Sequence, residues 1–133
     1  MRIMIDTNVI ISSLIKQGSV PDIVLNHVCH NHDLILCDHI INECYTVVKR
    51  RFPNKIDVLD DLFAQMKYEL LAAPRAGKVI ITDVKDQPIL NTAITHNVEI
   101  LVSGDKHFLE LGLDTPQIIN PTEFKRLYID SCS

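Results

Sequence analysis

Four acidic side chains stand at positions where they could act together. Asp6 follows the apolar run in MRIMIDTN, and Asp105 follows another in EILVSGDKHF. Asp86 precedes the segment QPILNTAI, and Glu43 lies one turn inside the helix predicted for HIINEC. Carboxylate oxygens are the hard ligands that Mg²⁺ and Mn²⁺ prefer. Two carboxylates ~4 Å apart repel each other by roughly 4 kcal/mol, so a fold that gathers several needs a cation, and such an ion supports phosphodiester hydrolysis.

Each acid also has an ordinary structural explanation. Asp6 and Asp86 could simply cap helices, because aspartate is favoured at helix starts. Asp105 follows Gly104 and could be a turn residue. Glu43 could point to solvent, although helical spacing places it at the edge of the apolar stripe. Because three of the acids occupy equivalent ends of strands or helices, we favour one shared site over four separate roles.

The elements that would carry these acids alternate between strands and helices. Apolar runs predict strands at residues 2–5, 34–37, 79–82, 99–103 and 117–119. Periodicity and capping signals predict helices through 10–15, from Ser19, from Asp38 to about Pro53, over 55–71, through 90–94, over 106–111 and over 122–128. This alternation predicts an α/β fold with a parallel sheet covered on both faces. Functional groups in such sheets gather beyond the carboxyl ends of the strands.

Composition limits the classes of protein that fit. The 133 residues are 47% hydrophobic, which favours one globular domain over residues 1–133 with a large core. The net charge of −4 argues against a broad basic surface for nucleic acid, although a metal ion could supply positive charge locally. The apolar stretch 9–15 is too short to span a membrane, and the start lacks the pattern of a signal peptide. Four scattered cysteines without a CxxC pair fit a reducing compartment, so we expect a soluble cytoplasmic protein with no membrane association.

Two further clusters invite functional interpretations. Potential metal ligands are concentrated in one segment: His27, Cys29, His30 and His32. No second group with zinc-site spacing accompanies them, so we interpret them as incidental. Basic residues end the third predicted helix: Lys49, Arg50 and Arg51. They could contact an RNA backbone or merely complement the helix dipole, and the sequence leaves both open.

Four segments, taken in order, resemble the PIN domain family of nucleases: IDTNVIISSL, HIINEC, VKDQPILNTAI and VSGDKHF. The resemblance extends from Met1 to the closing PTEFKRL. It implies a three-layer α/β/α sandwich around a parallel sheet and, for many members, metal-dependent endoribonuclease activity. Many small members are toxins of toxin-antitoxin pairs.

The resemblance also assigns residues. The four family acids match Asp6, Glu43, Asp86 and Asp105, and the neighbouring positions that would orient carboxylates or water match Asn8 and Ser103. Val84 and Gln87 depart from the residues that relatives often carry there, which leaves a fifth ligand open. The implied ligands of one or two Mg²⁺ or Mn²⁺ ions are Asp6, Asp86 and Asp105, completed by Glu43 directly or through water.

The resulting expectation is a single PIN domain that hydrolyses RNA. The implied partners are an RNA substrate, an antitoxin and a second copy in a homodimer. One alternative is a phosphatase of the haloacid dehalogenase type with Asp6 as nucleophile, which Asn8 weakens because those enzymes usually carry an acid there. Another is a PIN domain that binds RNA or a protein without cutting.

Overall fold

The fold is that of a computed structural model, which describes residues 1–73 and 87–132. The strands are β1 (Arg2–Ile5), β2 (Asp33–Cys37), β3 (Glu69–Leu71), β4 (Ile100–Val102) and β5 (Gln117–Ile119). The helices are α1 (Thr7–Ile15), α2 (Val20–Asn31), α3 (Asp38–Arg51), α4 (Ile56–Gln65), α5 (Gln87–Thr95), α6 (Lys106–Leu109) and α7 (Pro121–Phe124). A π-helical turn, Lys125–Ile129, continues α7, and short 3₁₀ turns occupy Pro53–Lys55 and Asp130–Cys132.

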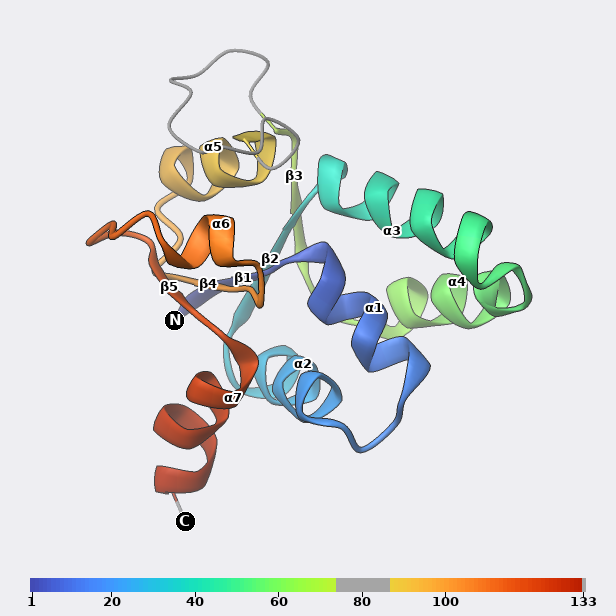
Figure 1. The fold of residues 1–133 in the computed structure, drawn as a ribbon, viewed down its shortest axis with the longest axis horizontal. Helices are drawn as coiled ribbons and strands as arrows, with labels where there is room; N and C mark the ends of the chain where they lie inside the picture. The colour runs from blue at the N-terminus through green and yellow to red at the C-terminus, as the bar shows by residue number, and fades with distance from the viewer. Residues whose placement is uncertain (74–86, 133) are drawn as a thin grey trace.

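The strands form a parallel sheet in the order β3-β2-β1-β4-β5. Strand β1 is central: Ile3 pairs with Leu34 of β2 on one side and with Ile100 of β4 on the other. Figure 1 shows α1 and α4 on one side of the sheet and α5 and α6 on the other. Residues buried on both faces explain why the strands are continuous apolar runs. The predicted α/β/α sandwich with a parallel sheet is confirmed.

The first two helices begin at polar caps that the sequence signalled. Asp6 precedes α1 and accepts a hydrogen bond from the backbone N–H of Asn8. Ser19 precedes α2 and accepts from the N–H of Asp22. Asp38 differs from the prediction, because it is the first residue of α3 and not its cap. Its Oδ1 accepts from the N–H groups of its neighbour and of Ala73, and so joins the start of α3 to the chain after β3.

The predicted helix over 55–71 is wrong beyond residue 65. Helix α4 ends at Gln65, because Met66 adopts extended backbone angles, and the chain then enters β3. Met66 and Leu70 continue the apolar spacing of α4 in the sequence, yet Leu70 belongs to the strand and is 53% exposed. Pairing of β3 with β2 supplies backbone hydrogen bonds that local periodicity does not record.

The remaining predicted elements have mixed outcomes. The strand predicted at 79–82 lies outside the described residues. The other predicted strands are confirmed within a residue of their ends, and the final helix starts one residue early at Pro121. No helix in the described ranges is long and apolar enough to cross a membrane.

The chain reverses its direction across the sheet between β1 and β4. From β1 it proceeds to β2 and β3 on one side, whereas from β4 it proceeds to β5 on the other. A crevice at the carboxyl ends of two such strands is where open α/β sheets place their ligands. The N–H of Asp6 donates to the carbonyl of Val102 at 3.1 Å, so Asp6 continues the β1–β4 ladder past the end of β1.

Candidate active site

Asp6 is the buried centre of the site. Only 4% of its surface is exposed, and both carboxylate oxygens accept hydrogen bonds. Oδ1 accepts from the N–H of Asn8 at 3.0 Å, and Oδ2 accepts from Ser103 Oγ at 2.5 Å. Burial raises the pKa of Asp6 to about 6, the two hydrogen bonds oppose this, and the negative charges of Glu43 and Asp105 add to it. The charged form of Asp6 is therefore disfavoured mainly by burial and further by the negative charges of two other acids.

Ser103 joins the acids that follow β1 and β4. It is fully buried, it donates to Asp6, and its Oγ accepts from the N–H of Asp105 at 3.0 Å. Because Ser103 lies directly after β4, its hydroxyl is positioned by the same ladder that positions Asp6. The chain Asp6–Ser103–Asp105 is a rigid unit built on two adjacent strand ends.

Glu43 reaches the site from α3. Its Oε1 accepts from Thr7 Oγ1 at 3.1 Å and lies 3.4 Å from Nε2 of His39, one turn earlier on the same helix. The side chain of Glu43 is 31% exposed. Helical spacing placed Glu43 at the edge of the apolar stripe, and it lies there, between the buried Ile40 and Cys44 side and solvent. Thr7 therefore positions this glutamate from the first residue of α1.

Asp105 caps α6 and has a histidine beside it. Its Oδ1 accepts from the N–H of His107 at 2.9 Å and lies 3.4 Å from Nδ1 of the same histidine. That nitrogen is enclosed by protein and makes no hydrogen bond of acceptable geometry to any described residue. The side chain of Asp105 is 23% exposed, so the cap leaves it partly accessible.

The remaining predicted residues have different positions. Asp86 lies outside the described residues, as does Val84. Asn8 is exposed, and its backbone N–H, not its side chain, makes the described contact with Asp6. Gln87 is buried at the start of α5 and donates to Asn91 at 2.8 Å. The structure thus brings Asp6, Ser103 and Asp105 into direct hydrogen-bonded contact, with Glu43 close enough to act on Asp6 electrostatically.

Three residues of the site were missed in the sequence: Thr7, His39 and His107. Thr7 follows Asp6 directly, and its contact with Glu43 depends on the packing of α1 against α3, which no local pattern reveals. His39 could have been found, because it lies four positions before Glu43 and so on the same helix face. His107 could have been found in the same way, since residues two positions after a cap lie beside it.

The ligand atoms of these residues can be compared with those that a divalent cation prefers. Among residues 1–73 and 87–132 no three His, Cys, Asp or Glu side chains form a preassembled ligand cluster. The donor chemistry nevertheless fits a hard cation, because Asp6, Glu43 and Asp105 all offer carboxylate oxygens. The negative charges of Glu43 and Asp105, which add to the burial that raises the pKa of Asp6, are charges that a bound cation would offset. The residues fit such an ion in type.

The histidines and the cysteine of residues 27–32 make contacts within the fold. His30 Nδ1 lies 2.7 Å from the carbonyl oxygen of Asn26, while the rings of His27 and His32 pack near the edge of Phe124. The histidines therefore help α2 to pack against α7. Cys29, a free thiol, has its pKa raised to about 11 by burial.

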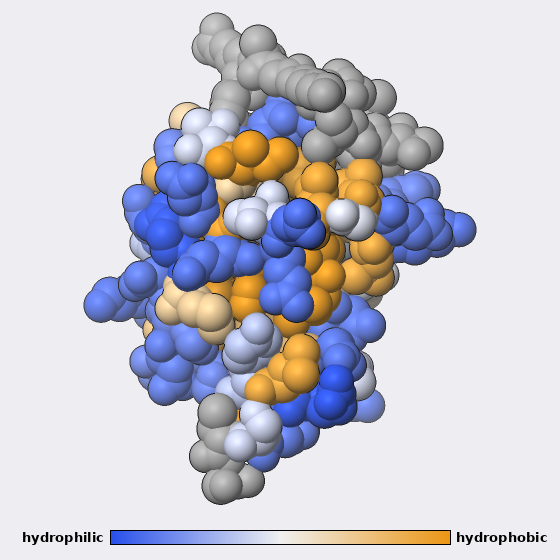
Figure 2. Space-filling view, turned by 90° about the vertical axis from the view of Figure 1, so that its left-hand side faces the viewer, coloured by the Kyte–Doolittle hydropathy of each residue, from blue (hydrophilic) through white to orange (hydrophobic). Residues whose placement is uncertain are grey.

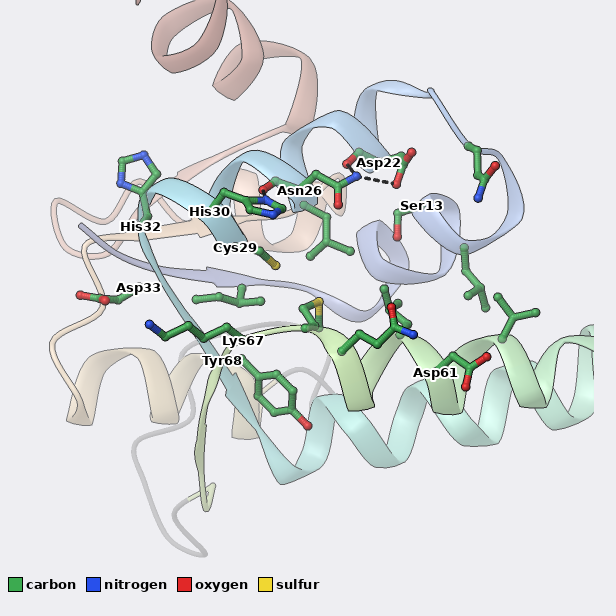
Figure 3. Close-up of a pocket in the computed structure, with 18 of the residues that line it drawn as sticks. Ser13, Asp22, Asn26, Cys29, His30, His32, Asp33, Asp61, Lys67 and Tyr68 are labelled. Atoms are coloured by element: carbon green, nitrogen blue, oxygen red, sulfur yellow. Dashed lines mark hydrogen bonds between the residues drawn. The ribbon is translucent and has the colours of Figure 1, made fainter.

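A large cavity lies away from the acids. It measures about 880 Å³ and is bounded mainly by α2, α4 and the β2–β3 end of the sheet. Figure 3 shows Asp22 and Asn26 of α2 on one side and Asp61 of α4 on the other. Asp6, Glu43 and Asp105, the predicted acids that the structure describes, do not line it, so the cavity is separate from the part of the candidate site that these residues form.

Comparison with known proteins gives two positive findings. A family model described as a PIN domain matches residues 2–107. The fold is similar to a chain in the crystal structure of VapBC2 from Rickettsia felis bound to a DNA fragment from their promoter, with a TM-score of 0.66 and 19% identity, covering 90% of this chain and 98% of that chain. No curated protein was found to match. The VapBC2 likeness concerns the fold alone, whereas the family model covers most of the chain and includes Asp6, Glu43 and Asp105: the chain belongs to the PIN domain family.

Proposed function

We propose that this protein is a metal-dependent endoribonuclease and the toxin of a toxin-antitoxin pair. The observation that carries the proposal is the hydrogen-bonded chain Asp6–Ser103–Asp105 at the reversal point of the sheet, with Glu43 facing it from the neighbouring helix. Membership of the PIN domain family supports a nuclease. Carboxylates gathered against their mutual repulsion are suited to a cation and, through it, to a phosphate.

The residues have distinct roles in this proposal. Asp6, Asp105 and Asp86 would hold one or two Mg²⁺ or Mn²⁺ ions, and Glu43 would complete the set. When bound, a divalent cation supplies charge that activates water and stabilises the leaving oxygen of a phosphodiester. Ser103 orients the side chain of Asp6 and keeps it able to ionise by donating to Oδ2, and it holds the backbone of Asp105 by accepting from its N–H. Thr7 orients the side chain of Glu43 by donating to its Oε1.

Cleavage of a mixed pool of labelled RNAs tests the proposed activity. We expect endonucleolytic products with Mn²⁺ or Mg²⁺ and none with EDTA, because the acids alone repel the phosphate. Release of inorganic phosphate from a small phosphomonoester, without RNA cleavage, would instead favour an aspartyl phosphatase. Both oxygens of Asp6 are already engaged by Ser103 and Asn8, which leaves Asp6 a poor nucleophile. RNA binding without cleavage under any metal condition would favour the non-catalytic alternative.

Ser103→Ala is expected to lower RNA cleavage by roughly 10- to 100-fold, as loss of a residue that orients metal ligands commonly does. The change removes the donor to Asp6 and the acceptor for the N–H of Asp105. Single-turnover cleavage at saturating Mn²⁺ and at limiting Mn²⁺ measures the effect, and the metal concentration for half-maximal rate should rise. Ser103→Thr keeps the hydroxyl and serves as the control. Equal activity of the alanine and threonine variants would contradict the role of the hydroxyl.

The proposed partners are an antitoxin and a second copy of the chain. The structural neighbour is a chain of a VapBC2 complex, which supports a partner protein. We propose that a tail of this partner covers the acids or their rim. Figure 2 shows apolar side chains gathered on the face that carries α5 and α6, where Ile94 and Leu109 are 46% and 37% exposed. Such a patch is typical of an association surface, and we assign it to a homodimer.

A further inference from the structure

The two flanks of helix α3 contact different neighbours. These contacts fix the rotation of the helix about its own axis. On one flank Tyr45 donates to Oδ1 of Asp60 on α4 at 2.5 Å. On the other flank Glu43 accepts from Thr7 of α1. Ile40, Cys44 and Val48 are buried between the two flanks. The rotation of α3 is therefore set independently by contacts on both sides.

This rotation places Arg50 on the flank of Glu43. Arg50 follows Glu43 by seven positions, so at about 100° per residue it lies within about 20° of Glu43 around the axis and about 10 Å farther along it. Val47, half-buried, lies between them. Figure 1 shows that α3 extends away from the sheet beside α4. Arg50 lies about 140° around the axis from Tyr45, which contacts α4, so the flank of Arg50 is directed away from α4.

Arg50 has no structural task that the described residues reveal. It is exposed, and it makes no ion pair with a carboxylate of residues 1–73 or 87–132. By contrast, Arg2, Lys125 and Arg126 are each paired with an acid. Lys49 is also exposed, but it lies about 120° around the helix from Glu43. Lys49 and Arg50 thus face different directions, and Arg50 is the one of the two that is in line with Glu43.

We propose that Arg50 binds a backbone phosphate of the RNA strand whose scissile bond lies at Asp6, Glu43 and Asp105. The inference rests on the proposed function. An anionic strand approaching an acidic site on a chain of net charge −4 needs a local cation beyond the cleavage position. The planar guanidinium of arginine suits this task, because it binds phosphate through two parallel hydrogen bonds. Lys106 also flanks the site, but it adjoins Asp105 directly, so its replacement would disturb the acids as well.

The test compares Arg50→Gln with Lys49→Gln, a matched control. Both variants lose one charge in the last turn of α3, so their effects on the helix dipole are equal. Binding of a short fluorescein-labelled single-stranded RNA is measured by anisotropy in the Asp6→Asn background, from about 50 to 200 mM salt. Cleavage kinetics are measured in the otherwise wild-type chain, and melting curves check the fold of every variant.

Arg50→Gln is expected to weaken RNA binding by roughly 3- to 10-fold and to reduce the slope of log K against log salt by about 0.7. The loss should enter KM and leave kcat within twofold, Arg50→Lys should restore most of the salt slope, and Lys49→Gln should match the parent. Equal effects of the two glutamine variants, or no change in slope for Arg50→Gln, would overturn the inference while leaving the nuclease intact. If the parent protein neither binds nor cleaves RNA, both the inference about Arg50 and the proposed nuclease function are wrong. This result would be seen before any variant is compared.

Discussion

Replacing Asp6 by asparagine is expected to reduce metal-dependent RNA cleavage by roughly a thousandfold or more, which corresponds to about 4 kcal/mol of lost transition-state stabilisation. The carboxylate is the central one of the site: it is 4% exposed, contacts Ser103, and carries the charge that Glu43 and Asp105 oppose. Asparagine keeps the shape and an oxygen for the N–H of Asn8, but it cannot supply a full negative charge to a cation.

The measurement is single-turnover cleavage of a labelled RNA at saturating Mn²⁺, with calorimetry of Mn²⁺ binding to the same two proteins. Asp22→Asn is a suitable control, because Asp22 lines the separate cavity between α2 and α4 and not the acidic site. We expect the control to cleave at the parental rate. Parental cleavage by the Asp6 variant would remove Asp6 from the catalytic site.

The second large effect concerns stability, and it follows from the raised pKa of Asp6. The pKa of Asp6 is about 6 in the folded protein, against 3.8 for an aspartate exposed to water, chiefly because of burial. Between about pH 4 and pH 6 the unfolded chain has released a proton that the folded protein retains, so the free energy of unfolding falls as the pH rises. The difference in pKa corresponds to about 3 kcal/mol, lost by pH 7 in metal-free protein.

Urea titrations of the metal-free protein at intervals from pH 4 to pH 7 measure this loss. The same titrations of Asp6→Asn supply the reference, because all other titrating groups are shared. The difference between the two curves should grow toward pH 6 and then level off, with the asparagine variant the more stable at pH 7. Mn²⁺ should restore stability to the wild type alone. Parallel curves for the two proteins would show that Asp6 is ionised at no cost in the fold.

Much of the fold could be predicted from local signals. Strands β1, β2 and β4 are buried on both faces, so their apolar runs were unambiguous. The polar caps Asp6 and Ser19 marked the starts of α1 and α2 because an N-cap is a local contact. Strand β3 could not be predicted in this way. It has three residues, lies at the end of the described sheet and is mostly exposed, so its only support is pairing with β2, which depends on a distant segment.

The strand-end positions of Asp6 and Asp105 were predictable from the sequence. The family resemblance named Ser103 as an orienting residue, but the sequence did not show that it contacts both aspartates. Asp6 and Asp105 could be placed at strand ends, since the end of an apolar run is visible in the sequence. The hydroxyl of Ser103 contacts both aspartates because β1 and β4, which are far apart in the chain, are adjacent in the sheet. The contact between Thr7 and Glu43 likewise depends on how two helices pack.

The hydrogen bond from the N–H of Asp6 to the carbonyl of Val102 bears on which molecule would change its conformation when the protein binds a nucleic acid. The backbone that carries Asp6 is pinned to the most interior strands of the sheet, and opening it would require breaking the ladder between β1 and β4. Such backbone opens only with free energies close to those of global unfolding. In the proposed nuclease the backbone of Asp6 therefore stays in place, and the substrate strand loses the entropy of reaching a reactive geometry. We expect an RNA strand that is already unpaired and flexible to lose least, and so to be cleaved most readily.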